Sequence, residues 1–92
     1  MTENEIEKKS VSEINRIPGC VAIKFADASR NGAPDRIVLM PNGRCMFLEF
    51  KLPGKEPRIE QVAYHKTLQE NGHIVYVVTS IDEAVRKVKE NL

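Results

Sequence analysis

The stretch GAPDRIVLMPNGRCMFLEFK, residues 32–51, decides how this chain folds. It contains two apolar runs of strand-forming residues on either side of the tripeptide Pro-Asn-Gly at 41–43, a pattern that predicts a β-hairpin. Charged residues interrupt both runs, because Asp35 opens the first and both Glu49 and Lys51 lie in the second. A charge in a buried strand is costly unless something pairs with it, so the hairpin register decides what these side chains do.

Two registers are open for this hairpin. If Asn42-Gly43 forms a two-residue turn, Arg36 lies opposite Glu49 in an ordinary cross-strand ion pair. If the loop has three residues and its Gly takes the left-handed conformation, Asp35 lies opposite Glu49 instead and shares a face with Lys51. Two carboxylates this close repel each other unless a proton or a cation lies between them, and a hard divalent ion suits their oxygen atoms.

The rest of the chain predicts an α/β domain with the element order αβββαβα. The strands form a mixed sheet flanked by helices. The connection from the third strand through the second helix to the fourth strand is long enough for a parallel crossover. The apolar run IVYVV at 74–78 is typical of a strand that is buried on both faces. The expected elements are a helix over about 3–17, strands over 20–25, 35–40 and 45–52, a helix over 58–71, a strand over 74–78 and a helix over 80–91.

Length and composition suit one domain that covers residues 1–92, with 41% hydrophobic residues for its core. The chain has no apolar run of about 18 residues and no signal-peptide pattern at its start, so we expect a cytoplasmic protein that does not enter a membrane. Cys20 and Cys45 lack metal-site spacing and are expected to be reduced core residues. The net charge is only +1, yet residues 24–58 hold seven Lys or Arg against four acids.

The residues Pro34-Asp35, followed after thirteen residues by Glu49-x-Lys51, match the PD-(D/E)xK nuclease signature. The segment from 32 to 61 closely resembles the VRR-NUC nucleases in its G-x-PD-R opening, its E-x-K strand, its G-K loop and the Gln of the following helix. The GHIVYVV strand and the short last helix also resemble stand-alone phage and bacterial members, so the resemblance covers nearly the whole chain. It implies a restriction-endonuclease-like PD-(D/E)xK fold.

The resemblance also implies the catalytic residues. Asp35 and Glu49 would bind Mg²⁺ or Mn²⁺, with the backbone carbonyl of Phe50 as a further ligand. Lys51 would orient or help to activate the attacking water and offset charge on the scissile phosphate. Gln61 matches the Gln of the family and would hydrogen-bond water, phosphate or a metal ligand.

An acidic residue of the first helix belongs to the related sites, and we expect Glu7 here, with Glu3 as the alternative. Tyr64 and His65 follow the family's Gln by three and four residues, so they either join the site or simply pack in the core. The phosphate-contact candidates are Arg36, which could equally form a surface salt bridge, the loop residues Gly54 and Lys55, and the weaker candidates Arg30, Arg44 and Arg58.

The function implied is that of a metal-dependent, structure-specific DNA endonuclease similar to Holliday-junction resolvases. Such an enzyme acts as a homodimer on a branched DNA, because two sites related by a two-fold axis can nick opposing strands of a four-way junction. The alternatives are a flap, nicking or nonspecific nuclease, a DNA-binding module without turnover, and an accessory subunit of a replication or recombination complex. All three catalytic residues of the signature are present, which speaks against the module without turnover.

Overall fold

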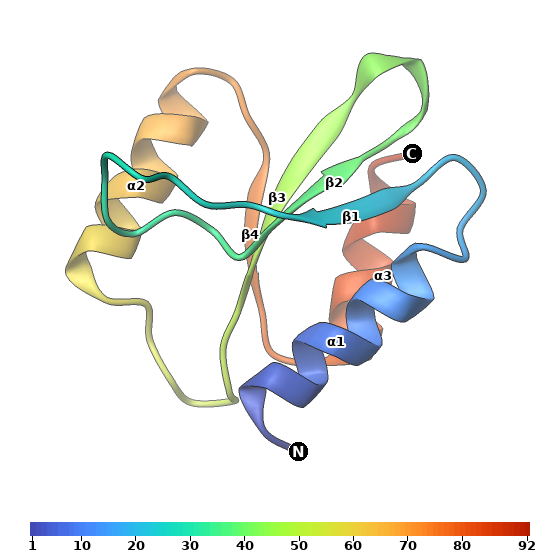
Figure 1. Cartoon of the computed structure of the whole chain (residues 1–92), viewed down its shortest axis with the longest axis horizontal. Helices are drawn as coiled ribbons and strands as arrows, with labels where there is room; N and C mark the ends of the chain where they lie inside the picture. Colours follow the sequence, from blue (N-terminus) through green and yellow to red (C-terminus); the bar gives the residue numbers. More distant parts are fainter.

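A four-stranded mixed sheet forms the centre of the fold in a computed structural model that describes residues 1–92 (Figure 1). The strands β1 (Val21–Lys24), β2 (Arg36–Leu39), β3 (Cys45–Phe50) and β4 (Val75–Val78) lie side by side in numerical order. The strand β2 is antiparallel to both of its neighbours, β1 and β3, and β4 runs parallel to β3. The predicted order αβββαβα and the mixed sheet are therefore confirmed.

Helices cover both faces of this sheet. Figure 1 shows α1 (Glu3–Ile14) and α3 (Ile81–Glu90) together on one side and α2 (Ile59–Glu70) on the other. Side chains alternate along a strand, and the even-numbered residues of β3 belong to the hydrophobic core beneath α1 and α3. Glu49, between two of these core residues, consequently points to the α2 face.

The β2–β3 hairpin adopts the three-residue register. The amide of Met40 donates to the carbonyl of Arg44 over 2.8 Å, and Arg36 lies opposite Leu48. Asn42 and Gly43 both have positive φ angles, of 65° and 73°, the left-handed backbone conformation that tight hairpin loops use to match the twist of the flanking strands. Continued by one residue, this register brings Asp35 opposite Glu49, and the two-residue alternative is wrong.

The first helix is shorter than expected, since it ends at Ile14 rather than near residue 17. The chain tightens there, with the amide of Arg16 donating to the carbonyl of Glu13. The side chain of Asn15 then accepts a hydrogen bond of 2.8 Å from the amide of Ala22. This bond occupies part of the free edge of β1, where an unpaired amide would otherwise face solvent.

The strand β4 is only partly buried, although its apolar sequence predicts a strand that is fully buried on both faces. Of its four residues only Val78 is fully buried, and the others are half-buried. The reason is its position, because β4 is an edge strand with a single neighbour. The run stays apolar because α2 covers one of its faces and α3 the other.

Two smaller expectations can be compared with the structure. Cys20 is buried and Cys45 is half-buried, and neither forms a disulfide. No helix in the chain is both long and apolar enough to cross a membrane.

Candidate active site

The end of the β2–β3 hairpin brings the predicted acidic and basic residues together beneath α2. The side chains of Glu49 and Lys51 are only 2% and 9% exposed, and Nζ of Lys51 lies 3.7 Å from Oε2 of Glu49. Asp35 stands just before β2, and its Oδ2 accepts a hydrogen bond of 2.8 Å from the amide of Phe50. The carboxylate of Asp35 is thus fixed to the strand that carries Glu49.

Gln61, at the start of α2, binds the same cluster. Its Nε2 donates to Oε2 of Glu49 over 2.9 Å, and its Oε1 accepts from the amide of Arg58 over 2.8 Å. These two bonds fix which end of the side-chain amide faces the carboxylate, because only the NH₂ group can donate to it. Gln61 therefore holds two things at once. It caps the start of α2, where the amide groups lack partners within the helix, and it binds the buried Glu49 carboxylate.

The site disfavours two negative charges. Burial and the charge of Asp35 raise the pKa of Glu49 to about 7, although Lys51 opposes the shift. Burial also raises the pKa of Asp35 above its ordinary value, against the effect of the hydrogen bond from Phe50. A cation placed between the two carboxylates would relieve both effects.

One atom of this cluster has no partner in the structure. Oε1 of Glu49 is buried and accepts no hydrogen bond, which is unusual for a buried polar atom. A carboxylate oxygen is a ligand that hard divalent cations prefer, so the donor set fits such an ion. No group of three or more His, Cys, Asp or Glu side chains in the chain is arranged to hold a metal ion.

The structure places Glu7 and Glu3 differently. Oε2 of Glu7 accepts a 2.7 Å bond from Nε of Arg36 and lies 3.8 Å from Nζ of Lys24. Oε2 of Glu3 accepts a bond of 3.3 Å from the amide of Leu52, directly after the E-x-K strand. The charge of Glu7 raises the pKa of Asp35, whereas the charge of Glu3 raises the pKa of Asp35 and that of Glu49.

The predicted phosphate-contact arginines differ in their exposure and in the side chains they contact. Arg36 is 18% exposed and forms the salt bridge with Glu7, so its guanidinium is already engaged. Arg58 is well exposed and pairs with Glu60 over 2.8 Å. The guanidinium of Arg30 lies 5.0 Å above the ring of Tyr64.

The loop that carries the G-x-PD residues is packed directly on α2. A Cβ atom at Gly32 would lie 2.2 Å from the carbonyl oxygen of Glu60, and its φ is +96°. Tyr64 reinforces this contact, because its hydroxyl donates to Oδ2 of Asp27 over 2.8 Å. The first glycine of the motif is therefore needed for close approach, which sets the position of Asp35.

His65 also lies at the site, a placement that the sequence left open. Its side chain is 9% exposed, and Nε2 lies 3.9 Å from Oε1 of Glu49. Burial and the charge of Lys51 lower the pKa of His65. The helical spacing of four residues from Gln61 was the only signal for it.

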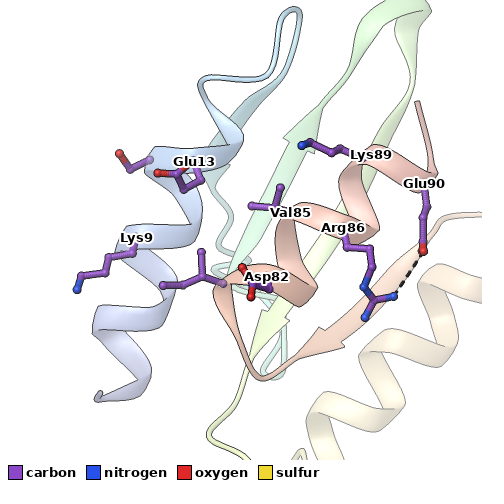
Figure 2. A pocket seen from close by; sticks show the side chains of 9 residues that line it. Lys9, Glu13, Asp82, Val85, Arg86, Lys89 and Glu90 are labelled. Carbon is purple, nitrogen blue, oxygen red and sulfur yellow. Dashed lines mark hydrogen bonds and ion pairs between the residues drawn. The ribbon is translucent and has the colours of Figure 1, made fainter.

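The largest groove of the protein, about 730 Å³, lies elsewhere. Figure 2 shows it between α1 and α3. Those two helices cover the other face of the sheet from α2 (Figure 1), whose Gln61 contacts Glu49. Charged side chains of both signs line it, including Lys9, Glu13 and the ion pair of Arg86 with Glu90. It contains none of the residues of the candidate site.

Comparison with known proteins agrees with the geometry, although no family model matches the chain. A protein named "Putative nuclease p44", from Acyrthosiphon pisum secondary endosymbiont phage 1, is 45% identical over 80 residues, which cover 87% of this chain and 85% of that protein. A solved structure described as "VRR_NUC domain" superposes with a TM-score of 0.86 at 25% identity, covering 98% of this chain and 97% of the other. With the PD and E-x-K residues brought together beneath α2, this chain belongs to the VRR-NUC family of nucleases.

Proposed function

We propose that the chain is a DNA endonuclease that depends on Mg²⁺ or Mn²⁺ and hydrolyses phosphodiester bonds by direct attack of water. One observation carries the proposal: the buried carboxylate of Glu49 leaves one oxygen without a partner, beside Asp35 and Lys51. An enclosed acid of this kind, with a raised pKa and a charged neighbour, is typical of a functional site.

The proposed ligands are Asp35, Glu49 and the backbone carbonyl of Phe50. Continuing the β2–β3 register places Pro34 opposite Phe50, and a proline has no N–H to donate. The amide of Phe50 instead donates to Asp35. The Phe50 carbonyl therefore lacks the ladder partner it would have in a regular strand, which supports a role as a ligand.

The other side chains would position the reactants. A bound divalent ion supplies a lowered pKa for water and offsets the charge that develops on the phosphate. Lys51, held by its contact with Glu49, would orient the water and face the scissile phosphate. Gln61 would fix the Glu49 carboxylate, and Glu7 would act through its contact with Arg36, with Glu3 as the alternative acid.

We further propose that the DNA backbone follows the basic residues around this site. Arg58 and Lys55 are exposed and stand near the start of α2. Gly54 has a φ of +83° with open space around it, so its loop leaves room for a phosphate to approach the backbone. Arg36 would contribute more weakly, since its side chain is only 18% exposed and is paired with Glu7. Arg30 is exposed but lies over the ring of Tyr64, so it would also contribute more weakly.

The proposed substrate is a branched DNA such as a four-way junction, cut by a homodimer. The exposed apolar side chains on the part of the sheet that α2 leaves uncovered support self-association: Val21, Ile23 and Leu39 are 48%, 41% and 44% exposed. Contiguous apolar surface of this kind often marks an interaction site. A dimer would also supply the extended surface that a branched substrate needs.

The test is cleavage of labelled four-way junction, flap, nicked and linear duplex DNA with Mg²⁺ and Mn²⁺, with Glu49→Ala in parallel. Paired symmetric nicks in the junction, together with a dimeric mass in solution, are the expected result. Preferred cleavage of flaps or linear DNA would retain the nuclease and reject the resolvase. A monomer that cuts none of these substrates with either metal would contradict the proposal and favour an accessory or binding role.

A further inference from the structure

His65 lies buried beside the catalytic carboxylate and has an unpaired nitrogen. Its Nε2 forms no hydrogen bond, and neither does Oε1 of Glu49. The two atoms face each other at 3.9 Å, with side chains that are 9% and 2% exposed. Buried polar atoms without partners are uncommon, and two of them on either side of one gap indicate that a further group belongs there.

The gap is too wide for a direct hydrogen bond, and both atoms are closed off from solvent, so a bridging water would enter with a small movement of the two side chains. A hydrogen bond between nitrogen and oxygen spans roughly 2.7–3.2 Å. A water oxygen about 2.8 Å from each atom would reach both across this gap. The other oxygen of Glu49 needs no such group, since Gln61 donates to it and Lys51 lies 3.7 Å away.

The helix α2 carries the side chains that lie next to both carboxylate oxygens of Glu49. Gln61 and His65 are four residues apart in α2, so their side chains lie on the same face of the helix. Gln61 is fixed to Oε2, and His65 points toward Oε1. Groups carried by a helix hold their positions more closely than groups on a loop.

His65 also lines a groove that is open to solvent. A groove of about 700 Å³ lies between α2, β4 and the loop after β3, with His65 in its wall next to Lys55 and Lys66. Water and small ions can therefore reach the imidazole from outside. A side chain that only filled the core would not need this access.

We propose that His65 is a positioning residue of the nuclease site, whose Nε2 and the Oε1 of Glu49 together hold a water molecule next to the divalent ion. The inference rests on the proposed metal-dependent function. Hydrogen-bond partners around a metal site orient its ligands and tune its affinity, and their loss typically costs about 10–100-fold in metal affinity or activity.

The first test observes the imidazole directly in the wild-type protein. The chain has only two histidines, and His73 is a matched control because its ring packs on Phe47 and its side chain forms no ion pair with Glu49. Long-range ¹H–¹⁵N spectra are recorded during titration with Mg²⁺ at fixed pH. We expect the Nε2 resonance of His65 to shift while that of His73 does not, and Glu49→Gln to abolish the shift. An unchanged His65 resonance, at Mg²⁺ concentrations that move the Phe50 amide, would overturn the inference.

The second test separates positioning from packing. His65→Phe fills the same space without the nitrogen, and we expect it to bind Mn²⁺ about 10-fold more weakly by calorimetry, with His73→Phe unchanged. A folded His65→Phe that loses thermal stability but keeps full Mn²⁺ affinity would show that His65 only packs. If the wild type neither binds Mn²⁺ nor cleaves DNA, the proposed function fails as well. If it does both and His65 has no effect, only this inference fails.

Discussion

The side-chain amide of Gln61 donates a 2.9 Å hydrogen bond to Oε2 of Glu49, so the start of α2 fixes a buried acid of the sheet. The same amide accepts from the backbone of Arg58 with its oxygen. A helix terminus and a candidate metal ligand therefore depend on one residue.

Replacing Gln61 with Leu should reduce cleavage by about 10-fold or more, because Glu49 loses its only hydrogen-bond donor. The rate is measured under single-turnover conditions with saturating Mg²⁺. Gln69→Leu, an exposed position on the same helix, serves as the control and should cut at the wild-type rate. Equal rates for both variants would remove Gln61 from the site.

Glu49 should make the metal-free protein less stable as the pH rises. Its pKa is about 7 in the folded state against an ordinary value of 4.5, so the folded state binds more protons than the unfolded state between these values. The free energy of unfolding then falls as pH rises through this range, and Glu49→Gln should remove up to about 3 kcal/mol of that fall.

The measurement is urea denaturation of both proteins in EDTA at pH 5 and pH 8. The comparison with Glu49→Gln isolates this residue from Asp35 and His65, which titrate in both proteins. Glu49→Gln should be the more stable protein at pH 8. A stability difference between the two proteins that does not change with pH would mean that the pKa of Glu49 is not raised in the folded state.

Divalent metal should reverse this instability. Ligand present at 100 times its dissociation constant stabilises a folded protein by about 2.7 kcal/mol, which is on the order of 10 °C in a chain of this size. Mn²⁺ should therefore raise the melting temperature of the wild type, and more at pH 8 than at pH 6 because protons compete for the carboxylates. Asp35→Asn and Glu49→Gln should show little of this increase. A rise of the same size in both variants would place the metal elsewhere.

Gly32→Ala should destabilise the protein more than Gly43→Ala. Both glycines have positive φ angles, which cost an alanine about 1 kcal/mol or more. Only at Gly32 would the new Cβ meet backbone, 2.2 Å from the carbonyl oxygen of Glu60, whereas nothing lies within 4 Å at Gly43. We expect a loss above about 2 kcal/mol for Gly32→Ala by chemical denaturation. Similar losses at both positions would show that close packing of this loop on α2 is not required.

Much of the site follows from local sequence rules. Alternation along the E-x-K strand placed Glu49 and Lys51 on one face, and the left-handed Gly43 selected the register that brings Asp35 opposite. Pro34 contributes as well, because it has no N–H and interrupts the ladder where Asp35 binds the Phe50 amide.

Other features depend on contacts between distant segments. The apolar run that became β4 looks the same in an edge or a central strand, because helices cover both of its faces in either case. Glu7 and Glu3 differ because Arg36, in β2, forms a salt bridge with Glu7 and not with Glu3. The approach of His65 to Glu49 depends on the rotation of α2 about its axis, which Gln61 and the Tyr64–Asp27 bond determine together.

The most direct test of the central claim is single-turnover cleavage of a labelled four-way junction by wild type and Glu49→Gln, each with Mg²⁺ and with EDTA. The substitution removes a proposed metal ligand but keeps the size of the side chain and its place between Gln61 and Lys51. We predict cleavage by the wild type with Mg²⁺ only, and none above background by Glu49→Gln. Cleavage by Glu49→Gln at the wild-type rate, or cleavage by the wild type in EDTA, would contradict the assignment of this site.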